Sequence, residues 1–480
     1  MLEIDRANIL GVGSIGVVFK GIWDEIEVAV KQIPIVNAVK CERELNALKM
    51  LNHENIVKLF HIEENQNFRC YALELCIASL DKLFLRGDDP KKYRFSMPPK
   101  QEVLLQLAKG LEYIHEMKLV HGDIKPENAL IWMNPENKKT KQRLMKYEKN
   151  NVQRETDVFA QGLLFGYYLT GGRHPFGSPV QIADNILTNN PVNLSRIQPQ
   201  NARNLIQEML ADQPEKRITS SKIVNQLEQM LSTTRINKRR LFVLFKAQTY
   251  PSEEEVKNLL QSVDINCRDN FGFTPLLHSV KIKNGDGEGI IRFLIQNGAN
   301  VNLRDHKGRN ALHILSDNQA TPNVLTIIKL LLDNQINVNC KSNTIMGWNA
   351  LHFFCAKYEN ENLIDIIRLL IESGIDANCK DRIGRNALHL LCEYYENGNL
   401  IDIIGILLEN GIDVNSINSR NGWNALYYLC QNYQKENLIE IIQLLIKNGI
   451  EVTSETFAYI AYRIFSKFER ELTHNRTNKI

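Results

Sequence analysis

Three polar side chains fall close together in one short stretch of the sequence. Asp123, Lys125 and Asn128 lie between an amphipathic run at residues 102–117 and an apolar run at residues 129–132. This pattern predicts a helix, a polar loop and a strand. A carboxylate can accept a hydroxyl proton, a lysine can neutralise a phosphoryl group, and an asparagine oxygen can hold Mg²⁺. The residue types in this loop are therefore those that phosphoryl transfer requires.

The loop reads His121-Gly122-Asp123-Ile124-Lys125-Pro126-Glu127-Asn128 and resembles the catalytic loop of protein kinases, His-Arg-Asp-x-Lys-x-x-Asn. By that resemblance Asp123 is the catalytic base, Lys125 contacts the phosphate and Asn128 is a metal ligand. Gly122 stands where the family has the arginine that senses a phosphorylated activation loop. We therefore expect that mode of control to be missing.

A glycine motif near the start of the chain agrees with this resemblance. Gly11, Gly13 and Gly16 form Gly-x-Gly-x-x-Gly, and the residues that follow, 17–21, read as a strand. A dinucleotide-binding fold would continue with a helix, so the motif resembles the kinase hairpin that closes over phosphates. Alone, such a motif is often only a turn that contains glycines.

Residues 27–31, Glu-Val-Ala-Val-Lys, resemble the Val-Ala-Ile-Lys strand of kinases. The resemblance implies that Lys31 binds the α- and β-phosphates of ATP, and that Val18 and Ala29 enclose the adenine. The alternative for Lys31 is a solvated lysine at a strand edge.

A helix predicted over residues 40–51 offers two partners for Lys31. Glu44 is the better candidate, and Glu42, on a different face, is the second. Residues 70–80 predict a buried strand that leads into a hinge. There Leu73 corresponds to the gatekeeper, and the backbone of Glu74 and Cys76 would face the adenine edge.

The hinge residues Glu74-Leu75-Cys76 and the later Gly172-Arg173-His174-Pro175-Phe176-Gly177 make the resemblance more specific. They are similar to those of the unfolded-protein-response sensor kinase/ribonucleases and of their relative ribonuclease L. This similarity covers roughly the first half of the chain and implies ATP and Mg²⁺ as cofactors.

The segment after Asn128 departs from the kinase pattern. Kinases hold a second metal ligand on Asp-Phe-Gly and close the activation segment with Ala-Pro-Glu, but residues 129–156 contain no aspartate. Residues 155–162 already resemble the next core helix of kinases, in which Asp157 would brace the catalytic loop. Because both metal ligands are needed, the loss costs on the order of 10³-fold or more in rate. We expect ATP to bind more weakly than in an intact kinase, and Mg²⁺ binding to be impaired.

Two other features lie near this gap. Arg217 resembles the arginine that pairs with the missing Ala-Pro-Glu glutamate, so it must find another partner or reach water. A basic run at residues 138–143, extended by Lys146 and Lys149, could bind an acidic partner or RNA. It contains no interleaved aromatic residues, so a solvated loop is the preferred interpretation and we predict no nucleic-acid partner.

The second half of the chain repeats itself. Asn-Ala-Leu-His at residues 310, 349 and 386, with variants at 274 and 424, recurs every 36 to 39 residues. The pattern resembles the ankyrin repeat, whose period is near 33, and the excess predicts longer connections between paired helices. We identify five units, a degenerate first helix pair at residues 238–263 and a cap at residues 454–468.

The repeated polar residues have both structural and functional interpretations. The histidines could bind a metal, but a turn that opens a helix gives them backbone partners, so we favour a structural role. Phe273, Arg309, Trp348, Arg385 and Trp423 occupy equivalent positions. We expect them to be exposed anchors for a protein partner on the concave face.

Composition agrees with an intracellular protein. The 480 residues are 44% hydrophobic and 24% charged, with a net charge of +3, and no apolar run approaches the ~20 residues that span a bilayer. An acidic start that leads into a predicted strand argues against a signal peptide. The nine cysteines form no Cys-x-x-Cys pair. We therefore expect no membrane contact and a cytoplasmic location.

The predicted architecture is an α+β, bilobal kinase fold at residues 1–233 followed by an all-α ankyrin solenoid at residues 234–475. The kinase lobes would be residues 1–76 and 77–233. Because repeats follow where a nuclease domain would stand, we expect no ribonuclease activity. Three functions remain open. The chain could be an ATP-binding pseudokinase or weak serine/threonine kinase, or a non-catalytic scaffold. It could also be an active kinase whose metal ligand is unorthodox or lies in a coding segment that this sequence lacks.

Overall fold

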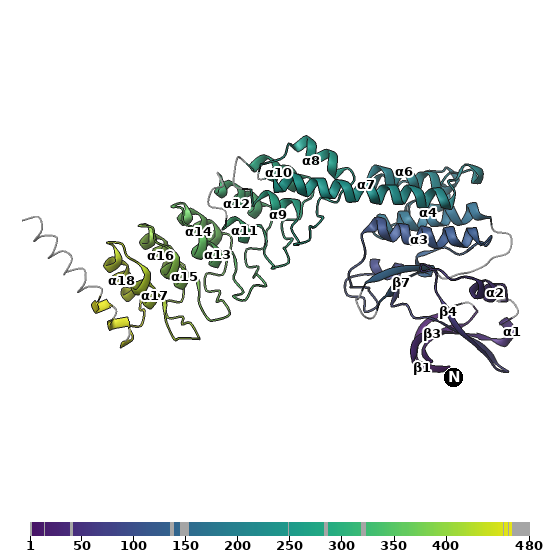
Figure 1. Ribbon diagram of the computed structural model, residues 1–480, viewed down its shortest axis with the longest axis horizontal. Coiled ribbons are helices and arrows are strands. Elements are labelled where there is room, and N and C mark those ends of the chain that lie inside the picture. Colours follow the sequence, from purple (N-terminus) through teal and green to yellow (C-terminus); the bar gives the residue numbers. More distant parts are fainter. Residues whose placement is uncertain are drawn as a thin grey trace, which may run out of the picture. The chain divides into compact units, whose positions relative to one another are not determined.

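The computed structural model describes residues 2–13, 15–38, 42–134, 139–144, 153–247, 249–282, 287–317, 323–454, 456–458 and 460–462, and omits the side chain of Arg43. The chain divides into two compact units, Met1–Arg235 and Ile236–Ile480 (Figure 1). No helix among these described residues is long and apolar enough to cross a membrane.

The first unit begins with an antiparallel sheet in the order β1-β2-β3-β5-β4. Its strands are β1 (Glu3–Val12), β2 (Val17–Trp23), β3 (Ile26–Pro34), β4 (Leu59–Glu64) and β5 (Phe68–Glu74). Side chains alternate between two apolar faces, because successive residues of a strand point in opposite directions. Val28 and Val30 pack on one face. On the other face Ile33 packs against Leu45 and Leu48 of α2 (Glu42–Met50).

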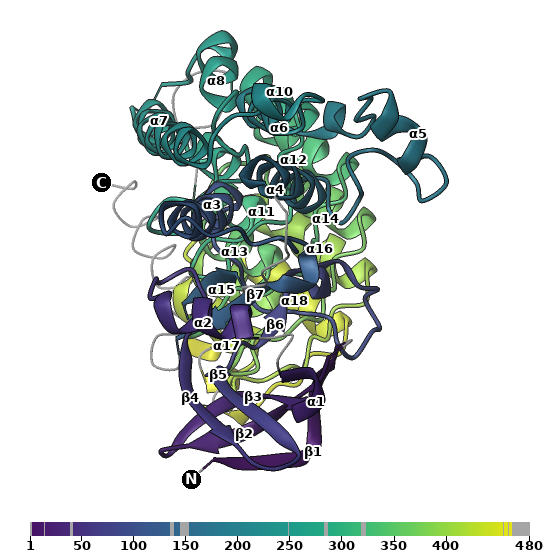
Figure 2. The same ribbon diagram turned by 90° about the vertical axis from the view of Figure 1, so that its right-hand side faces the viewer.

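Helices and a small sheet, β6-β7-β8, form the rest of this unit. The elements are β6 (Ala78–Ser79), α3 (Lys100–Glu116), β7 (Ala129–Met133), β8 (Thr140–Leu144), α4 (Arg154–Leu169), α5 (Ile182–Leu187), α6 (Gln200–Met209) and α7 (Ser220–Lys246). Their shared core includes the fully buried Leu107, Phe165, Ile206 and Leu227. Within this unit α5 projects away from α4 and α6 (Figure 2). A sheet-rich lobe followed by a helical lobe is the predicted kinase architecture.

Helix α7 contributes side chains to the cores of both units. It runs unbroken for 27 residues, and the predicted domain boundary at residue 234 falls inside it. Its first half contributes Ile223 and Leu227 to the core of the first unit. Its last turns contribute Leu241 and Phe245 to the core of the repeats.

The second unit is a stack of helix pairs, as the repeat pattern predicted. The end of α7 and α8 (Glu253–Leu260) form the degenerate first pair. The following pairs are α9 (Pro275–Ser279) with α10 (Glu288–Gln296), α11 (Ala311–Leu315) with α12 (Val324–Asp333), α13 (Ala350–Lys357) with α14 (Leu363–Glu372), α15 (Ala387–Tyr394) with α16 (Leu400–Glu409), and α17 (Ala425–Asn432) with α18 (Leu438–Lys447). In Figure 1 the odd-numbered helices α9 to α17 form one row, and the loops that precede these helices extend from it. We call these loops fingers; residues 269–273 and 305–309 belong to the first two. Of the predicted cap, residues 455, 459 and 463–468 lie outside the described residues.

The Asn-Ala-Leu-His motif begins each first helix for a local reason. Asn310, Asn349, Asn386 and Asn424 are N-caps, and the side chain of each accepts a hydrogen bond from the backbone three residues later. Thr274 caps α9 in the same way. Such a cap satisfies one of the backbone N–H groups that a helix start leaves without a partner.

Asparagines also join neighbouring units. Asn339 Nδ2 donates to the carbonyl of Gly374 at 2.9 Å, and its oxygen accepts from the N–H of Asp376 at 2.8 Å. Asn266, Asn302, Asn378 and Asn415 make the same pair of bonds to the next unit. We call this series the asparagine ladder.

The extra residues of each repeat lie between its paired helices, as predicted. α13 ends at Lys357 and α14 begins at Leu363. In the next unit the hydroxyl of Tyr395 donates to Asn399 Oδ1 at 2.8 Å, and Asn399 Nδ2 donates to the carbonyl of Glu361 at 3.0 Å. Tyr433 and Asn437 repeat this arrangement one unit later. The long connections therefore form a second set of bonds between units.

Candidate functional site

A buried ion pair links the β-sheet to α2. Lys31 Nζ, on β3, lies 2.6 Å from Glu44 Oε1, and both side chains are about nine-tenths buried. The alternative partner, Glu42, instead binds Arg69 at 2.6 Å. Lys31 is therefore no solvated edge lysine, and of the two glutamates it is Glu44 that it contacts. Removing either partner would break this buried pair and destabilise the charge that remains.

The three loop residues of the sequence motif also come together. Lys125 Nζ lies 2.9 Å from Asp123 Oδ2. Asn128 Nδ2 donates to the same oxygen at 2.9 Å and to the backbone carbonyl of Asp123 at 2.8 Å. Because both bonds use the amide nitrogen, the Asn128 side-chain oxygen is the atom that can ligate a metal. One carboxylate and one amide oxygen are part of an Mg²⁺ ligand set, which phosphates and water can complete.

Asp157, at the start of α4, holds the backbone of this loop. It accepts hydrogen bonds from the N–H groups of His121 at 2.7 Å and Gly122 at 2.8 Å, and His115 Nε2 lies 3.1 Å away. The carboxylate is 1% exposed, so these bonds are its compensation for burial. Gly122 has a φ of 74°, a left-handed conformation that favours glycine. A glycine where kinases have arginine thus suits the backbone of this loop.

The predicted glycine hairpin joins β1 to β2. Gly11 is paired with Val18, which is paired in turn with Lys31 on β3. The N–H of Gly13 donates to the carbonyl of Gly16 at 2.9 Å and closes the turn, within which Ser14 lies outside the described residues. A Cβ on Gly16 would collide with the carbonyl oxygen of Gln32. The hairpin therefore lies directly beside the strand that carries Lys31.

Several of the residues predicted to contact the adenine belong to one apolar cluster. Leu73 is buried in a cluster against which Ala29, Cys76 and Leu130 pack while remaining partly exposed. Val18 is likewise only partly buried. Burial raises the pKa of Cys76 to about 12, so its thiol stays protonated. Leu130, on β7, was not predicted as a site residue, although it lies two residues after Asn128 in an apolar strand.

Arg143 corrects the interpretation of the basic run as a solvated loop. Residues 140–144 form β8, and Arg143 is 9% exposed. Its Nη2 donates to Glu74 Oε1 at 2.8 Å, and its guanidinium lies 5.0 Å from the Trp132 ring. Burial raises the pKa of Glu74, and Arg143 opposes that shift only in part. A strand explains the pattern, because residues 140–144 continue the hairpin from β7. Lys138, Lys146 and Lys149 lie outside the described residues.

Arg217 has found backbone partners in place of a glutamate. Its guanidinium donates to the carbonyls of Ala211 at 2.8 Å, Glu155 at 3.0 Å and Asp212 at 3.2 Å. It also lies 4.7 Å from the Phe159 ring. Burial lowers its pKa. Several carbonyl oxygens at one guanidinium compensate for burial without a second charge.

The described residues that follow Asn128, 129–134, 139–144 and 153–156, contain no aspartate that could be a second metal ligand. The described residues likewise contain no group of three histidine, cysteine, aspartate or glutamate side chains suited to a metal ion. A strand before Asp-Phe-Gly would be expected at residues 144–147, but β8 ends at Leu144 and residues 145–147 lie outside the described residues. The chain thus forms a lysine–glutamate pair and a polar loop in which Asp123 is the carboxylate that Lys125 and Asn128 contact.

The repeat residues predicted as exposed anchors are not exposed. Phe273 and Arg385 are 8% and 4% exposed, and Arg309, Trp348 and Trp423 are partly buried. Arg385 binds Asp381 at 3.0 Å and Glu393 at 2.7 Å, and Arg309 binds Asp305 at 2.8 Å. These positions therefore fix the roots of the fingers. The prediction failed because aromatic residues and arginine can also anchor a fold internally.

The repeat histidines have the predicted structural surroundings. His313 and His389 complete a capping box with the asparagine that precedes their helix. His352 Nε2 lies 3.2 Å from the carbonyl of Arg385 in the next unit. Burial lowers the pKa of His313, His352 and His389 to about 4, so all three rings are neutral near pH 7.

Comparison with known proteins agrees with this geometry. The protein kinase domain model matches residues 4–144, and the model of ankyrin repeats (3 copies) matches residues 244–342, 318–418 and 351–456. The chain is 28% identical over 263 residues to serine/threonine-protein kinase/endoribonuclease ire-1 of Caenorhabditis elegans, covering 47% of this chain and 27% of that protein. It is 27% identical over 343 residues to the sensor for unfolded proteins in the ER ire1 of Schizosaccharomyces pombe, covering 58% and 31%.

A human relative, serine/threonine-protein kinase/endoribonuclease IRE2, is 28% identical over 270 residues, covering 46% of this chain and 28% of that protein. The chain thus spans less than a third of the length of these curated relatives. The Lys31–Glu44 pair, the Asp123 loop and the stacked helix pairs lead to one conclusion. The chain carries a protein kinase domain followed by ankyrin repeats, and its kinase domain is similar to those of the unfolded-protein-response sensor kinases.

Proposed function

We propose that this chain is an ATP-binding, serine/threonine-kinase-like signalling protein with impaired phosphoryl transfer, and that its repeats recognise a protein partner. One observation carries the proposal. The Lys31–Glu44 pair is formed, at 2.6 Å, in a chain that has no aspartate between Asn128 and Asp157. This supports a chain that can hold the phosphates of ATP but lacks the second carboxylate for the metal.

Each site residue has a role in this proposal. Gly11, Gly13 and Gly16 cover the phosphates, and Lys31, oriented by Glu44, binds their α- and β-oxygens. Val18, Ala29, Leu73 and Leu130 enclose the adenine, whose edge meets the backbone of Glu74 and Cys76. The bound nucleotide supplies the γ-phosphoryl group. Asp123 accepts the proton of an incoming hydroxyl, and Lys125 stabilises negative charge beside it.

The missing carboxylate weakens this arrangement at one point. Asn128 alone would bind Mg²⁺ through a neutral oxygen, whereas the family uses a carboxylate in addition. A weaker metal site stabilises the charge of the transition state less, which lowers the rate more than nucleotide affinity. Nucleotide binding without efficient transfer is the expected behaviour.

One observation favours an active kinase as the second candidate. Lys125 and Asn128 each lie 2.8 to 2.9 Å from Asp123, and Asp157 holds the loop backbone. An intact base could support slow transfer if another group completes the metal site. Labelled-phosphate transfer, described below, distinguishes the two candidates.

Thermal unfolding with and without ATP tests the nucleotide site. We expect ATP to raise the melting temperature of the kinase unit, and Mg²⁺ to add little to that shift. Lys31→Met should abolish the shift, and Glu44→Gln should reduce it. Lys49→Met, on the exposed side of α2, is the matched control and should behave as wild type. A shift that survives Lys31→Met would contradict the assignment.

Labelled-phosphate transfer to a generic protein substrate tests the catalytic part. We expect a rate at least on the order of 10³-fold below that of an intact kinase, because a metal ligand is missing. Asp123→Asn should lower any residual rate further. Rapid transfer that disappears in Asp123→Asn would establish an active kinase instead.

The cytoplasm is the proposed location. Cys340, Cys355, Cys379 and Cys392 are buried thiols in the structure, and buried thiols without disulfides are typical of reducing compartments. Fractionation of cells that express a tagged chain would test this. A membrane-bound or secreted chain would contradict it.

A further inference from the structure

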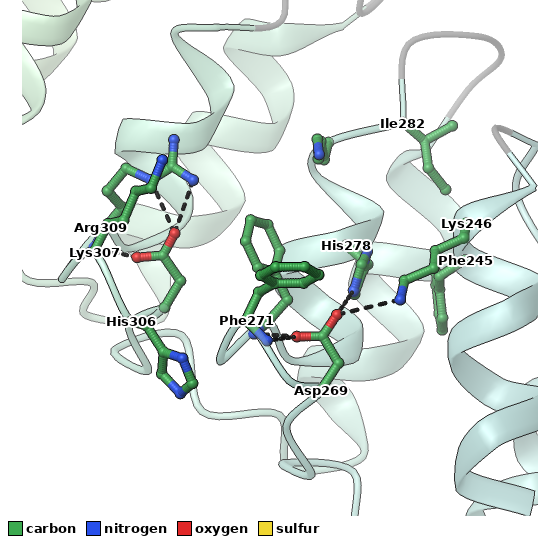
Figure 3. A pocket seen from close by; sticks show the side chains of 12 residues that line it. Phe245, Lys246, Asp269, Phe271, His278, Ile282, His306, Lys307 and Arg309 are labelled. Atoms are coloured by element: carbon green, nitrogen blue, oxygen red, sulfur yellow. Dashed lines mark hydrogen bonds and ion pairs between the residues drawn. The ribbon is translucent and has the colours of Figure 1, made fainter.

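The second compact unit, which contains the repeats, has a pocket of about 460 Å³ near its first helix pairs. It lies between the end of α7, the end of α9 and two fingers, at residues 269–273 and 305–309 (Figure 3). All of its lining residues belong to the second unit. It therefore lies on the row of first helices and fingers, outside the kinase site.

The two carboxylates of the pocket are already paired. Asp269 Oδ2 lies 3.0 Å from His278 Nε2 and 3.5 Å from Lys246 Nζ (Figure 3). Burial acts to raise its pKa, but bonds from His278 and from the backbone of Phe271 and Phe273 outweigh this, and the pKa of Asp269 is lowered. Asp305 binds Arg309 at 2.8 Å. Neither aspartate is available to balance a further cation.

Two lysines of the lining have no such partner. Lys281 and Lys307 are exposed, and no carboxylate among the described residues lies within ion-pair distance of either. The Lys281 ammonium instead lies 5.5 Å from the centre of the Phe273 ring. Once the internal pairs are formed, the lining therefore keeps an excess of positive charge. Such a surface attracts a ligand that carries negative charge.

An aromatic side chain stands beside this charge. Phe271, at the tip of the first finger, is 68% exposed, whereas Phe245 and Phe273 are buried in the pocket wall at 1% and 8%. Further along the fingers Ile345 is 80% exposed. Exposed large apolar side chains that lie next to a pocket are typical of interaction sites. Because the exposed apolar positions continue beyond the pocket, an extended polypeptide fits them better than a small molecule.

We propose that this pocket binds a segment of a partner protein in which an acidic side chain stands close to an aromatic or large aliphatic one. The acidic group pairs with Lys281 and Lys307, and the apolar group packs on Phe271. This inference rests on the proposed role of the repeats in protein recognition and gives that role a location and a partner chemistry. It does not depend on the nucleotide site.

Selection from a random peptide library displayed on phage tests the inference with the full-length chain. We expect the selected peptides to share an acidic residue within a few positions of Phe, Trp, Tyr or Leu. A synthetic peptide of that consensus should bind at least tenfold more weakly to the double variant Lys281→Glu/Lys307→Glu and to Phe271→Ala. Lys329→Glu, the same charge change on the exposed side of α12, should bind as wild type. All substituted side chains are exposed, so unchanged melting temperatures verify folding.

Several results would overturn the inference. Selected peptides without acidic residues would exclude the proposed chemistry. Peptides that bind the pocket variants as well as wild type would place recognition elsewhere on the repeats and leave the proposed function intact. Displacement of the peptide by ATP would show a nucleotide site in place of a peptide site. If no peptide were enriched over a blank surface, protein recognition by the repeats would fail together with the pocket.

Discussion

Polar side chains serve different purposes in the two compact units. In the kinase unit the polar contacts are not repeated along the chain. Lys31, on β3, binds Glu44, whereas Asp123 and Asp157 bind residues of one loop. In the repeats, asparagines recur at a fixed spacing and bind the next repeat, as His352 also does. Polar contacts therefore join neighbouring repeats in one unit, and in the other they surround the loop that we propose as a site.

This difference teaches how to weigh polar motifs in a sequence. A motif that recurs with the period of the fold satisfies a need that every unit shares, such as a capped helix or a joined neighbour. A motif that occurs once, beside other single motifs, has no such structural explanation. The repeat histidines belong to the first kind, and the Asp123 loop belongs to the second.

Acidification should give the largest effect and should act on the repeats. His313, His352 and His389 have folded pKa values of about 4 because of burial, whereas unfolded histidine titrates near 6.5. Below pH ~6.5 the unfolded state therefore binds more protons, and stability falls as the pH drops toward about 4, by up to ~1.4 kcal/mol per histidine and pH unit. Calorimetry at pH 7 and pH 5 would measure this, and His352→Gln should reduce the pH dependence while exposed His306→Gln should not.

If the repeat unit unfolds at the same temperature at both pH values, the buried histidines do not oppose protonation. The structural role assigned to the repeat histidines would then lose its main support.

Asp157→Ala should have the next largest effect and should act on both stability and function of the kinase unit. Two backbone N–H groups and His115 would lose their acceptor, which costs roughly 3 kcal/mol or more. ATP binding should weaken as well, because the loop that Asp157 holds would move. Urea unfolding and the thermal shift with ATP measure the two effects, and Asp157→Asn should be milder.

Asp381→Ala provides the matched test in the repeats. Asp381 is 6% exposed and binds Arg385, so its loss should lower stability without changing ATP binding. Equal effects of the two variants on ATP binding would break the distinction between site and scaffold.

Asn339→Ala should have a smaller effect, confined to the joint between two repeats. It removes the bonds to Gly374 and Asp376, each worth about 0.5–1.5 kcal/mol. Asn410→Ala removes a bond to Ile406 within one helix and serves as the control. Hydrogen exchange should show greater opening at the joint only for Asn339→Ala. Identical exchange in the two variants would mean that the asparagine ladder does not couple units.

Tyr395→Phe should have the smallest effect. It removes the hydroxyl that donates to Asn399, at a cost of about 0.5–1.5 kcal/mol, and leaves the buried ring in place. Tyr394→Phe, at a neighbouring position that is 47% exposed, should be close to neutral. Equal urea midpoints for the two variants would show that the long connections contribute no stability between units.

Sequence patterns predicted most of the architecture because it follows from local rules. The period of the apolar residues and the caps at Asn310 and its equivalents indicate the helices, and the motifs around Lys31 and Asp123 indicate the kinase fold. Of the candidate site, the mutual contacts of the residues agree with the motifs, while their roles stay predictions.

The failures share a physical cause. Arg143 in a basic run and Arg385 at the root of a finger look like surface residues, yet both are buried by acidic partners. Glu74 is 69 residues from Arg143 in the sequence, so no local pattern reveals the pair. The pocket was not predicted for the same reason, because its lining residues come from positions 245 to 309, which are far apart in the sequence.

The unbroken course of α7 has a practical consequence for dissecting the chain. A fragment that ends at residue 233 would lack no core side chain of the kinase unit, but a fragment that starts at residue 247 would lose Leu241 and Phe245 from the repeats. The two halves therefore cannot be separated at the end of the helix without exposing apolar surface on the second one. Expression of the repeats alone should begin well upstream of Leu241, with the shared helical turns present in both fragments.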